Sequence, residues 1–89
     1  MLEVTLAVKN KVGLHARPAS LFVNAAKKFK SEITVSKAET TVNAKSILSI
    51  LTLGVNQGTV IVIKANGEDE GQAVKALQAL VETNFGETE

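Results

Sequence analysis

The chain has 89 residues, of which 45% are hydrophobic and three are aromatic, and it carries a formal net charge of +1. This length allows one small domain with an aliphatic core and argues against a deep substrate pocket. The absence of cysteine excludes disulfides and thiolate metal sites, and no segment resembles an export signal or a membrane span. We therefore expect residues 1–89 to form a single cytoplasmic domain without membrane insertion.

Charge is distributed unevenly along the chain. Residues 1–45 carry eight Lys or Arg and three acidic residues, whereas residues 46–89 carry two and six. A basic half favours encounters with an acidic or phosphorylated partner, because the distribution of charge acts on association rates more than on fold. An ordinary solvated surface is the alternative explanation.

The first half of the chain shows strand and helix periodicities in turn. Residues 2–8 alternate between apolar and other side chains, which predicts a strand with one buried face. After a turn at 10–13, apolar residues spaced three and four apart predict a helix that ends among lysines. Residues 33–36 and 40–42 are predicted to pair as a hairpin around a tight reversal at 37–39. The apolar stripe of the helix consists of Ala19, Phe22, Ala26 and Phe29.

The next stretch predicts a short helix followed by a strand. The hydroxyl of Ser46 can cap the start of a very apolar helix over residues 47–51, and Gly54 is placed to end it. Residues 59–64 are rich in β-branched side chains and are bounded by glycines, which predicts a well-buried strand near the centre of the sheet.

The last helix is predicted from its first turn onward. Asp69 and Gln72 resemble a capping box, in which two side chains satisfy the free N–H groups of a helix start. The tail after Asn84 is expected to be frayed. The apolar stripe of this helix consists of Ala73, Leu77, Leu80 and Val81.

The predicted order is strand, helix, strand, strand, short helix, strand, helix. This order favours an α+β fold with one sheet and its helices packed on one face. A ferredoxin-like binding domain has a similar alternation, and periodicity alone does not separate the two. The strands lack the aromatic residues that an RNA-binding version would use, so we expect no nucleic-acid partner.

The segment Gly13-Leu14-His15-Ala16-Arg17-Pro18-Ala19-Ser20 joins the only histidine and the only arginine at a predicted helix start. No Ser, Thr, Asp or Asn stands just before this helix, so the N–H groups of its first turn are free to bind an anion. The guanidinium of Arg17 suits phosphate oxygens, and His15 is a nitrogen nucleophile that the positive helix end keeps neutral. A phosphohistidine is therefore chemically reasonable. The alternative is that His15 caps the helix and Arg17 is a surface charge.

Gly13-Leu14-His15-Ala16-Arg17-Pro18-Ala19 resembles the active-site signature of the HPr family, and Lys45-Ser46-Ile47-Leu48-Ser49-Ile50-Leu51 resembles its second signature. The resemblance implies an open-faced β-sandwich, a four-stranded antiparallel sheet with three helices on one face. It also implies a stoichiometric phosphocarrier rather than an enzyme, a monomer without cofactor. In the family, enzyme I, charged by phosphoenolpyruvate, phosphorylates the histidine at Nδ1, and the carrier then donates to IIA domains of sugar permeases.

The same resemblance assigns roles to further residues. His15 matches the phosphoryl acceptor and Arg17 the arginine that stabilises phosphate, with the backbone N–H of Ala16 sharing the charge. Ser46 matches a serine that HPr kinase/phosphorylase modifies in many relatives. This match implies a catabolite-control regulator as a further partner. A plain helix cap is equally expected at this position. The face that meets enzyme I and IIA would comprise Ser20, Asn24, Ile47, Leu48 and Leu51.

Alternatives exist for the apolar helix, for the histidine and for the function. The apolar residues of 47–53 exceed what a two-turn helix buries on one side, so some are expected at the surface, although each alone could belong to the core. A hydrolytic triad and a metal centre are disfavoured, because one histidine has no partner cluster. A regulatory HPr paralogue that acts by protein binding rather than sugar transport is the alternative function, and the presence of His15 favours the carrier.

Overall fold

The computed structural model describes residues 1–86. The polypeptide alternates between strands and helices in the order that the periodicities predict. The elements are β1 (Leu2–Ala7), α1 (Ala16–Lys27), β2 (Glu32–Lys37), β3 (Thr40–Asn43), α2 (Ile47–Leu53), β4 (Val60–Asn66), α3 (Glu70–Glu82) and a 3-10 turn, η1 (Asn84–Gly86).

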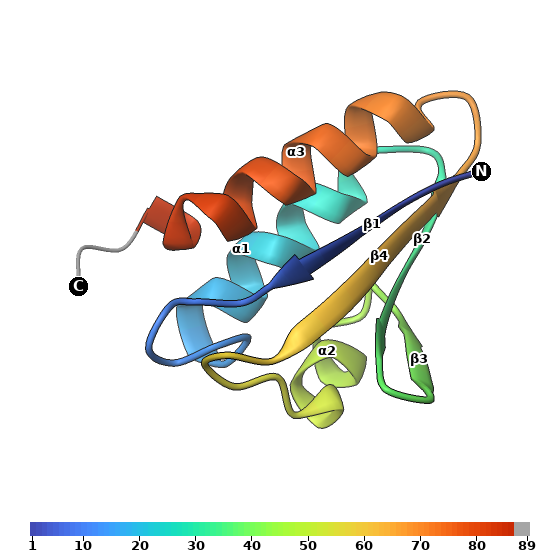
Figure 1. Cartoon of the computed structure of the whole chain (residues 1–89). Helices are drawn as coiled ribbons and strands as arrows, with labels where there is room; N and C mark the ends of the chain where they lie inside the picture. The colour runs from blue at the N-terminus through green and yellow to red at the C-terminus, as the bar shows by residue number, and fades with distance from the viewer. Residues whose placement is uncertain (87–89) are drawn as a thin grey trace.

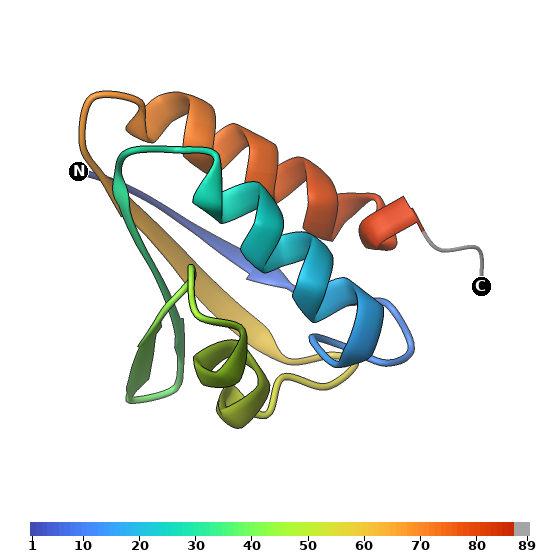
Figure 2. The same ribbon diagram turned by 180° about the vertical axis from the view of Figure 1, so that it is seen from behind.

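The four strands form one antiparallel sheet in the order β1-β4-β2-β3. The sheet places β4 between β1 and β2, so its predicted central position is confirmed. All three helices lie on one side of the sheet, with α1 beside α3 and α2 near the end of the sheet that carries the β3 hairpin (Figures 1 and 2). The open-faced α+β sandwich is therefore confirmed.

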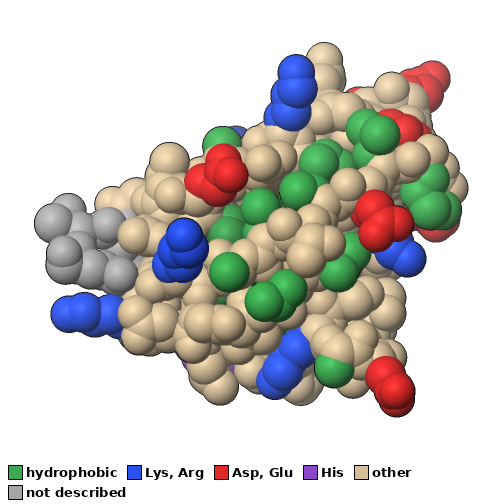
Figure 3. Space-filling view, in the orientation of Figure 1, with side chains coloured by type: hydrophobic (Ala, Val, Ile, Leu, Met, Phe, Trp, Pro, Cys, Tyr) green, Lys and Arg blue, Asp and Glu red, His purple; other side chains and the backbone are tan. Residues whose placement is uncertain are grey.

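The core lies between the helices and the covered face of the sheet. Ile61, Ile63 and Ala65 of β4 are fully buried, and they alternate with exposed or partly exposed neighbours. The expectation of a well-buried strand is therefore correct for one face only, since Val60 is 55% exposed. No helix covers the opposite face, where hydrophobic side chains lie in a band among charged ones (Figure 3). Strand β1 is also less buried than its alternation predicts, because it forms an edge of the sheet and its Leu2 is exposed.

Local capping predictions have two outcomes. Ser46 does cap α2, since its hydroxyl accepts a hydrogen bond from the N–H of Ser49, and Gly54 ends α2 in the left-handed conformation. The capping box predicted at Asp69 is wrong, because the Asp69 side chain makes no bond to its own helix. Its carboxylate instead accepts hydrogen bonds from the segment after α1, namely from the N–H groups of Lys30 and Ser31 and from the Ser31 hydroxyl.

The predicted fraying of the tail after Asn84 is wrong for residues 85–86. These two residues form η1 together with Asn84, and Phe85 is only 2% exposed. Phe85 is one of three aromatic residues in the chain, and its burial ties the end of α3 to the core. Residues 87–89 lie outside the described part of the chain.

Within residues 1–86, no helix combines the length and the apolar character needed to cross a membrane. The longest helix, α3, has 13 residues, and a membrane-spanning helix needs about 20.

Candidate functional site

His15 occupies the N-cap position of α1, in extended backbone conformation. No side chain caps this helix end, and its first turn contains no acidic residue. Pro18, buried within the first turn, has no N–H to satisfy. Ala16 has φ 50, in the left-handed region that non-glycine residues seldom occupy. The structure thus combines free N–H donors with a strained residue directly after the histidine, an arrangement found at ligand sites.

The imidazole of His15 is partly exposed and makes one hydrogen bond, 3.0 Å long, between its Nε2 and the side-chain oxygen of Asn56. With the amide oxygen of Asn56 facing the ring, the contact is a hydrogen bond in the tautomer that carries its proton on Nε2. The other ring nitrogen, Nδ1, has no hydrogen-bond partner among residues 1–86. In that tautomer the lone pair available for nucleophilic attack is on Nδ1.

The loop that carries His15 lies directly against the loop between α2 and β4. The N–H of Leu14 donates to the carbonyl oxygen of Val55 at 3.0 Å, one residue before His15 on one side and Asn56 on the other. Gly13, with φ 62, permits this approach, because a Cβ atom there would lie 2.2 Å from the Val55 oxygen. The position of His15 therefore depends on a contact between segments about 41 residues apart.

Arg17 is the second residue of α1 and is exposed. Its guanidinium forms no ion pair within residues 1–86, where the structure has a single ion pair, between the N-terminal amine and Glu70. The free guanidinium and the free helix N–H groups can bind phosphoryl oxygens, and the unprotonated ring nitrogen beside them can accept the phosphoryl group.

The site is an open surface rather than a pocket. Two hollows of about 380 and 370 Å³ lie on the β2–β3 ladder and between β1 and α3, and neither is lined by His15 or Arg17. An open site suits a protein partner that brings and removes the reacting group, because a small substrate is normally enclosed in a concave pocket. Among residues 1–86, no group of three His, Asp or Glu could hold a metal ion.

The residues predicted to meet partners lie on α1 and α2, which contact each other. On α2, three apolar side chains are exposed, Ile47 by 44%, Leu48 by 70% and Leu51 by 38%, whereas its remaining Ile and Leu residues are buried. On α1, Ser20 is partly buried and Asn24 is exposed. The expectation that some of the α2 apolar surface is exposed is confirmed; its role as a partner face stays a prediction.

Sequence reasoning did not find Asn56. It follows a short apolar helix in a loop, and no spacing rule connects it to a histidine 41 residues earlier. The one sequence signal that points to Asn56 is the segment Asn56-Gln57-Gly58, a polar turn directly before a strand. Such turns are common in proteins without any role in a site.

The fold and the site together define a small α+β protein with a partly exposed histidine at an uncapped, cationic helix end. A family model described as the PTS HPr component phosphorylation site matches residues 2–83. The chain therefore belongs to the HPr family, the phosphocarrier proteins of the phosphotransferase system.

Individual relatives agree in sequence and in structure. The phosphocarrier protein HPr of Neisseria meningitidis serogroup A is 43% identical over 89 residues, which are 100% of both chains. The crystal structure of HPr-C-His from Thermoanaerobacter tengcongensis is 56% identical, covers 100% of both chains and superposes with a TM-score of 0.98. Crh, the catabolite repression containing protein of Bacillus subtilis, is 42% identical over 94% of this chain and 97% of its own, with a TM-score of 0.75, and its crystal structure is described as a dimer with a swapping domain.

Proposed function

We propose that this protein accepts a phosphoryl group from phosphorylated enzyme I on Nδ1 of His15 and donates it to IIA components of sugar permeases. The observation that carries the proposal is the state of the His15 ring. Its Nε2 is engaged by Asn56, and its Nδ1 is free beside an uncapped helix start.

The transfer needs positioning and charge stabilisation more than acid–base chemistry. The Nδ1 lone pair forms a bond to phosphorus while the bond from phosphorus to the donor breaks, and the donor keeps that electron pair. The N–H groups of Ala16 and Arg17 and the Arg17 guanidinium stabilise the negative charge on the phosphoryl oxygens. Transfer to IIA reverses these steps, so the protein acts stoichiometrically as a carrier rather than as an enzyme.

The proposed partner face combines the site with the exposed apolar residues of α2. Ile47, Leu48 and Leu51 offer a contiguous docking surface on the helix beside α1, and Ser20 and Asn24 extend it toward His15. Enzyme I and IIA would bind this face in turn, because each must reach the same nitrogen. Such use fits a cytoplasmic monomer, and sedimentation at micromolar concentration should give the mass of one chain.

A second function is favoured by Ser46 and by the similarity to Crh. The partly exposed Ser46 hydroxyl caps α2 beside the proposed docking face. Phosphorylation there by HPr kinase/phosphorylase would add a charge of about −1.5 to −2 next to Ile47, which opposes an acidic or phosphorylated partner while favouring the helix start. The modified protein would then serve a catabolite-control regulator rather than sugar transport.

The proposal is tested by incubation with phosphoenolpyruvate and enzyme I. The expected product carries one phosphoryl group per chain, labile in acid and stable in alkali, and it does not form in His15→Ala. Ser46→Ala serves as the matched control and should be phosphorylated as the unsubstituted chain is. If folded protein takes up no phosphoryl group from several enzyme I preparations, transport is contradicted and the regulatory function is favoured.

A further inference from the structure

The loop between α2 and β4 reaches the ring of His15 through one side chain. Asn56 is exposed, and its only side-chain hydrogen bond within residues 1–86 is the one to Nε2 of His15. An exposed amide in a loop is normally bonded to water, so its placement at 3.0 Å from the ring needs a cause in the backbone.

The backbone around Asn56 supplies that cause. The N–H of Asn56 donates to the hydroxyl of Thr59, and the N–H of Thr59 donates to the carbonyl oxygen of Asn56, both at 3.1 Å. This closed turn is joined to the His15 loop by the bond from Leu14 to Val55. Asn56 is therefore held on both sides, by its own turn and by the neighbouring loop.

We propose that Asn56 is a positioning residue for phosphoryl transfer: its amide oxygen keeps the proton of His15 on Nε2 and so presents Nδ1 to the incoming phosphorus. This inference rests on the proposed function of His15 as the phosphoryl acceptor. Asn56 acts only through the ring and touches neither partner's reacting atoms.

The hydrogen bond between the His15 ring and the Asn56 amide oxygen stabilises the ring throughout the transfer. As Nδ1 forms its bond to phosphorus, the donor's bond breaks and positive charge develops on the ring, which strengthens the hydrogen bond from Nε2–H to the amide oxygen. The proton stays on Nε2, so the group is accepted and given up without a proton transfer. A neutral acceptor is suited to this role, because a carboxylate at the same place would favour the protonated ring, which has no lone pair on Nδ1.

Nuclear magnetic resonance of the ring nitrogens tests this inference without any enzyme. The unsubstituted protein is expected to carry the proton of its neutral ring on Nε2, and Asn56→Ala should show a larger population with the proton on Nδ1. In Asn56→Asp the midpoint of the ring titration should move up by about one pH unit. Gln57→Ala is the matched control, since the neighbouring Gln57 side chain donates to the carbonyl of Lys9 and not to the ring.

Single-turnover transfer from phosphorylated enzyme I gives the second readout. Asn56→Ala should lose about tenfold in rate, the size of effect that one hydrogen bond supports, while Gln57→Ala stays within about twofold. An amide spectrum that matches the unsubstituted protein away from residues 13–17 and 54–59 shows that the variant is folded.

The outcomes separate this inference from the proposed function. If the unsubstituted protein takes up no phosphoryl group, the proposed function fails, whereas the nitrogen spectra still decide whether Asn56 sets the proton's position. If transfer to the unsubstituted protein is fast and Asn56→Ala matches it in both rate and ring spectrum, the role of Asn56 is overturned. A ring with its proton on Nδ1 in the unsubstituted protein overturns it as well.

Discussion

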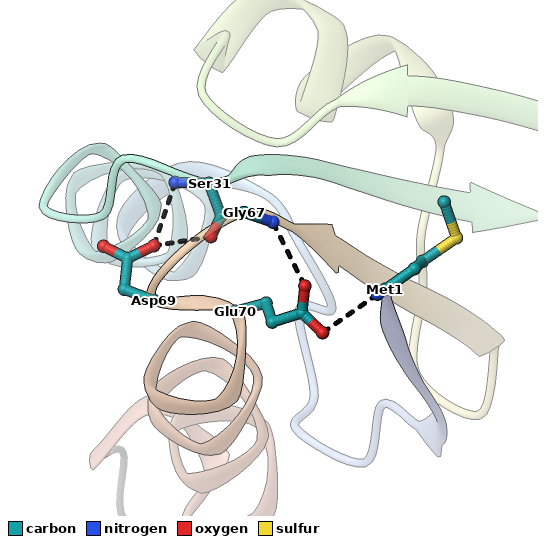
Figure 4. A network of polar contacts seen from close by, with 5 residues as sticks. All are labelled: Met1, Ser31, Gly67, Asp69 and Glu70. Carbon is teal, nitrogen blue, oxygen red and sulfur yellow. Dashed lines mark hydrogen bonds and ion pairs between the residues drawn. The ribbon is translucent and has the colours of Figure 1, made fainter.

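The two ends of helix α1 differ in how their polar groups are satisfied. At its start, His15 occupies the cap position without capping the helix, and Ala16 adopts a strained backbone conformation. Beyond its end, the Asp69 carboxylate accepts one hydrogen bond from the N–H of Lys30 and two from Ser31. Figure 4 shows the two from Ser31. One end leaves donors free for a ligand, and the other uses its donors to hold α1 and α3 together.

The bonded end also carries the strongest electrostatic effects. The hydrogen bond from the Ser31 hydroxyl, followed by those from backbone N–H groups, lowers the pKa of Asp69 from 3.8 to about 2. The N-terminal amine of Met1 and the N–H of Gly67 lower the pKa of Glu70 (Figure 4). Stabilising polar contacts therefore gather at the end near Asp69, while the end that carries His15 leaves its N–H groups free to bind a ligand.

Removing a cation at the start of α1 should have the largest effect on the transfer rate, and removing one at the other end serves as its control. Arg17→Ala should slow phosphoryl transfer by about 10²- to 10³-fold, because it removes a charge that stabilises the transferring group. Lys28→Ala, at the other end, removes an exposed cation and should change the rate by less than about twofold. Rapid-quench kinetics with phosphorylated enzyme I measures both. Equal rates for the two variants would contradict the role of Arg17.

The close contact of the His15 loop with Val55 predicts the next effect. Gly13→Ala should cost roughly 3 kcal/mol of stability, since it combines a left-handed backbone with a Cβ atom 2.2 Å from the Val55 oxygen. Gly58→Ala is the control, because Gly58 is also left-handed but its Cβ would meet nothing within 4 Å. Its cost should be about 1 kcal/mol. Urea unfolding compares the two, and an equal loss would show that the loops do not depend on this contact.

The stability of the protein at acidic pH tests the hydrogen bonds that Asp69 accepts near the end of α1. The folded-state pKa of Asp69 is depressed, so its contribution is present above its ordinary pKa of 3.8 and is lost as the pH falls toward 2. Ser31→Ala removes the largest cause of the depression, so it should lower stability at neutral pH and flatten the decline between pH 4 and 2.

The control for this change is Ser36→Ala, whose hydroxyl bonds to Thr41 and to no carboxylate. Its effect on urea unfolding should be the same at every pH between 2 and 7. Parallel stability curves for Ser31→Ala and the unsubstituted protein would show that the Ser31 hydroxyl does not stabilise the ionised Asp69 carboxylate.

The smallest expected effect concerns a helix that is capped. Ser46→Ala should destabilise the protein by about 0.5–1 kcal/mol, because it removes the hydroxyl that accepts from the N–H of Ser49. Thr52→Ala, which removes an exposed hydroxyl on the same helix, should stay within about 0.5 kcal/mol. Thermal unfolding measures both, and a loss for Thr52→Ala as large as that for Ser46→Ala would contradict the cap.

Local patterns predict much of this molecule, and contacts between distant segments account for what they miss. The order of strands and helices follows from apolar spacing, and Ser46 was correctly predicted as a cap because its partner is three residues away. Asp69 was predicted wrongly because its partner, Ser31, lies 38 residues earlier in the chain. The burial of Phe85 depends in the same way on packing that no local window contains.

The residues of the candidate site also differ in whether a local pattern predicts them. His15 and Arg17 were predicted from one segment, since histidine, arginine and an uncapped helix start are adjacent in sequence. Asn56 was missed because its contact with His15 crosses two loops. The proposed chemistry of the site can thus be predicted from residues 13–19, whereas the orientation of its ring depends on contacts between two loops that are distant in sequence.

Amide spectra recorded before and after phosphorylation by enzyme I test the contrast between the two ends most directly. We expect large shifts for the N–H groups of Ala16 and Arg17, which gain an anion to bind, and unchanged positions for those of Lys30 and Ser31. Unchanged signals at Ala16 and Arg17 in a fully phosphorylated protein, or equal shifts at both ends, would contradict it.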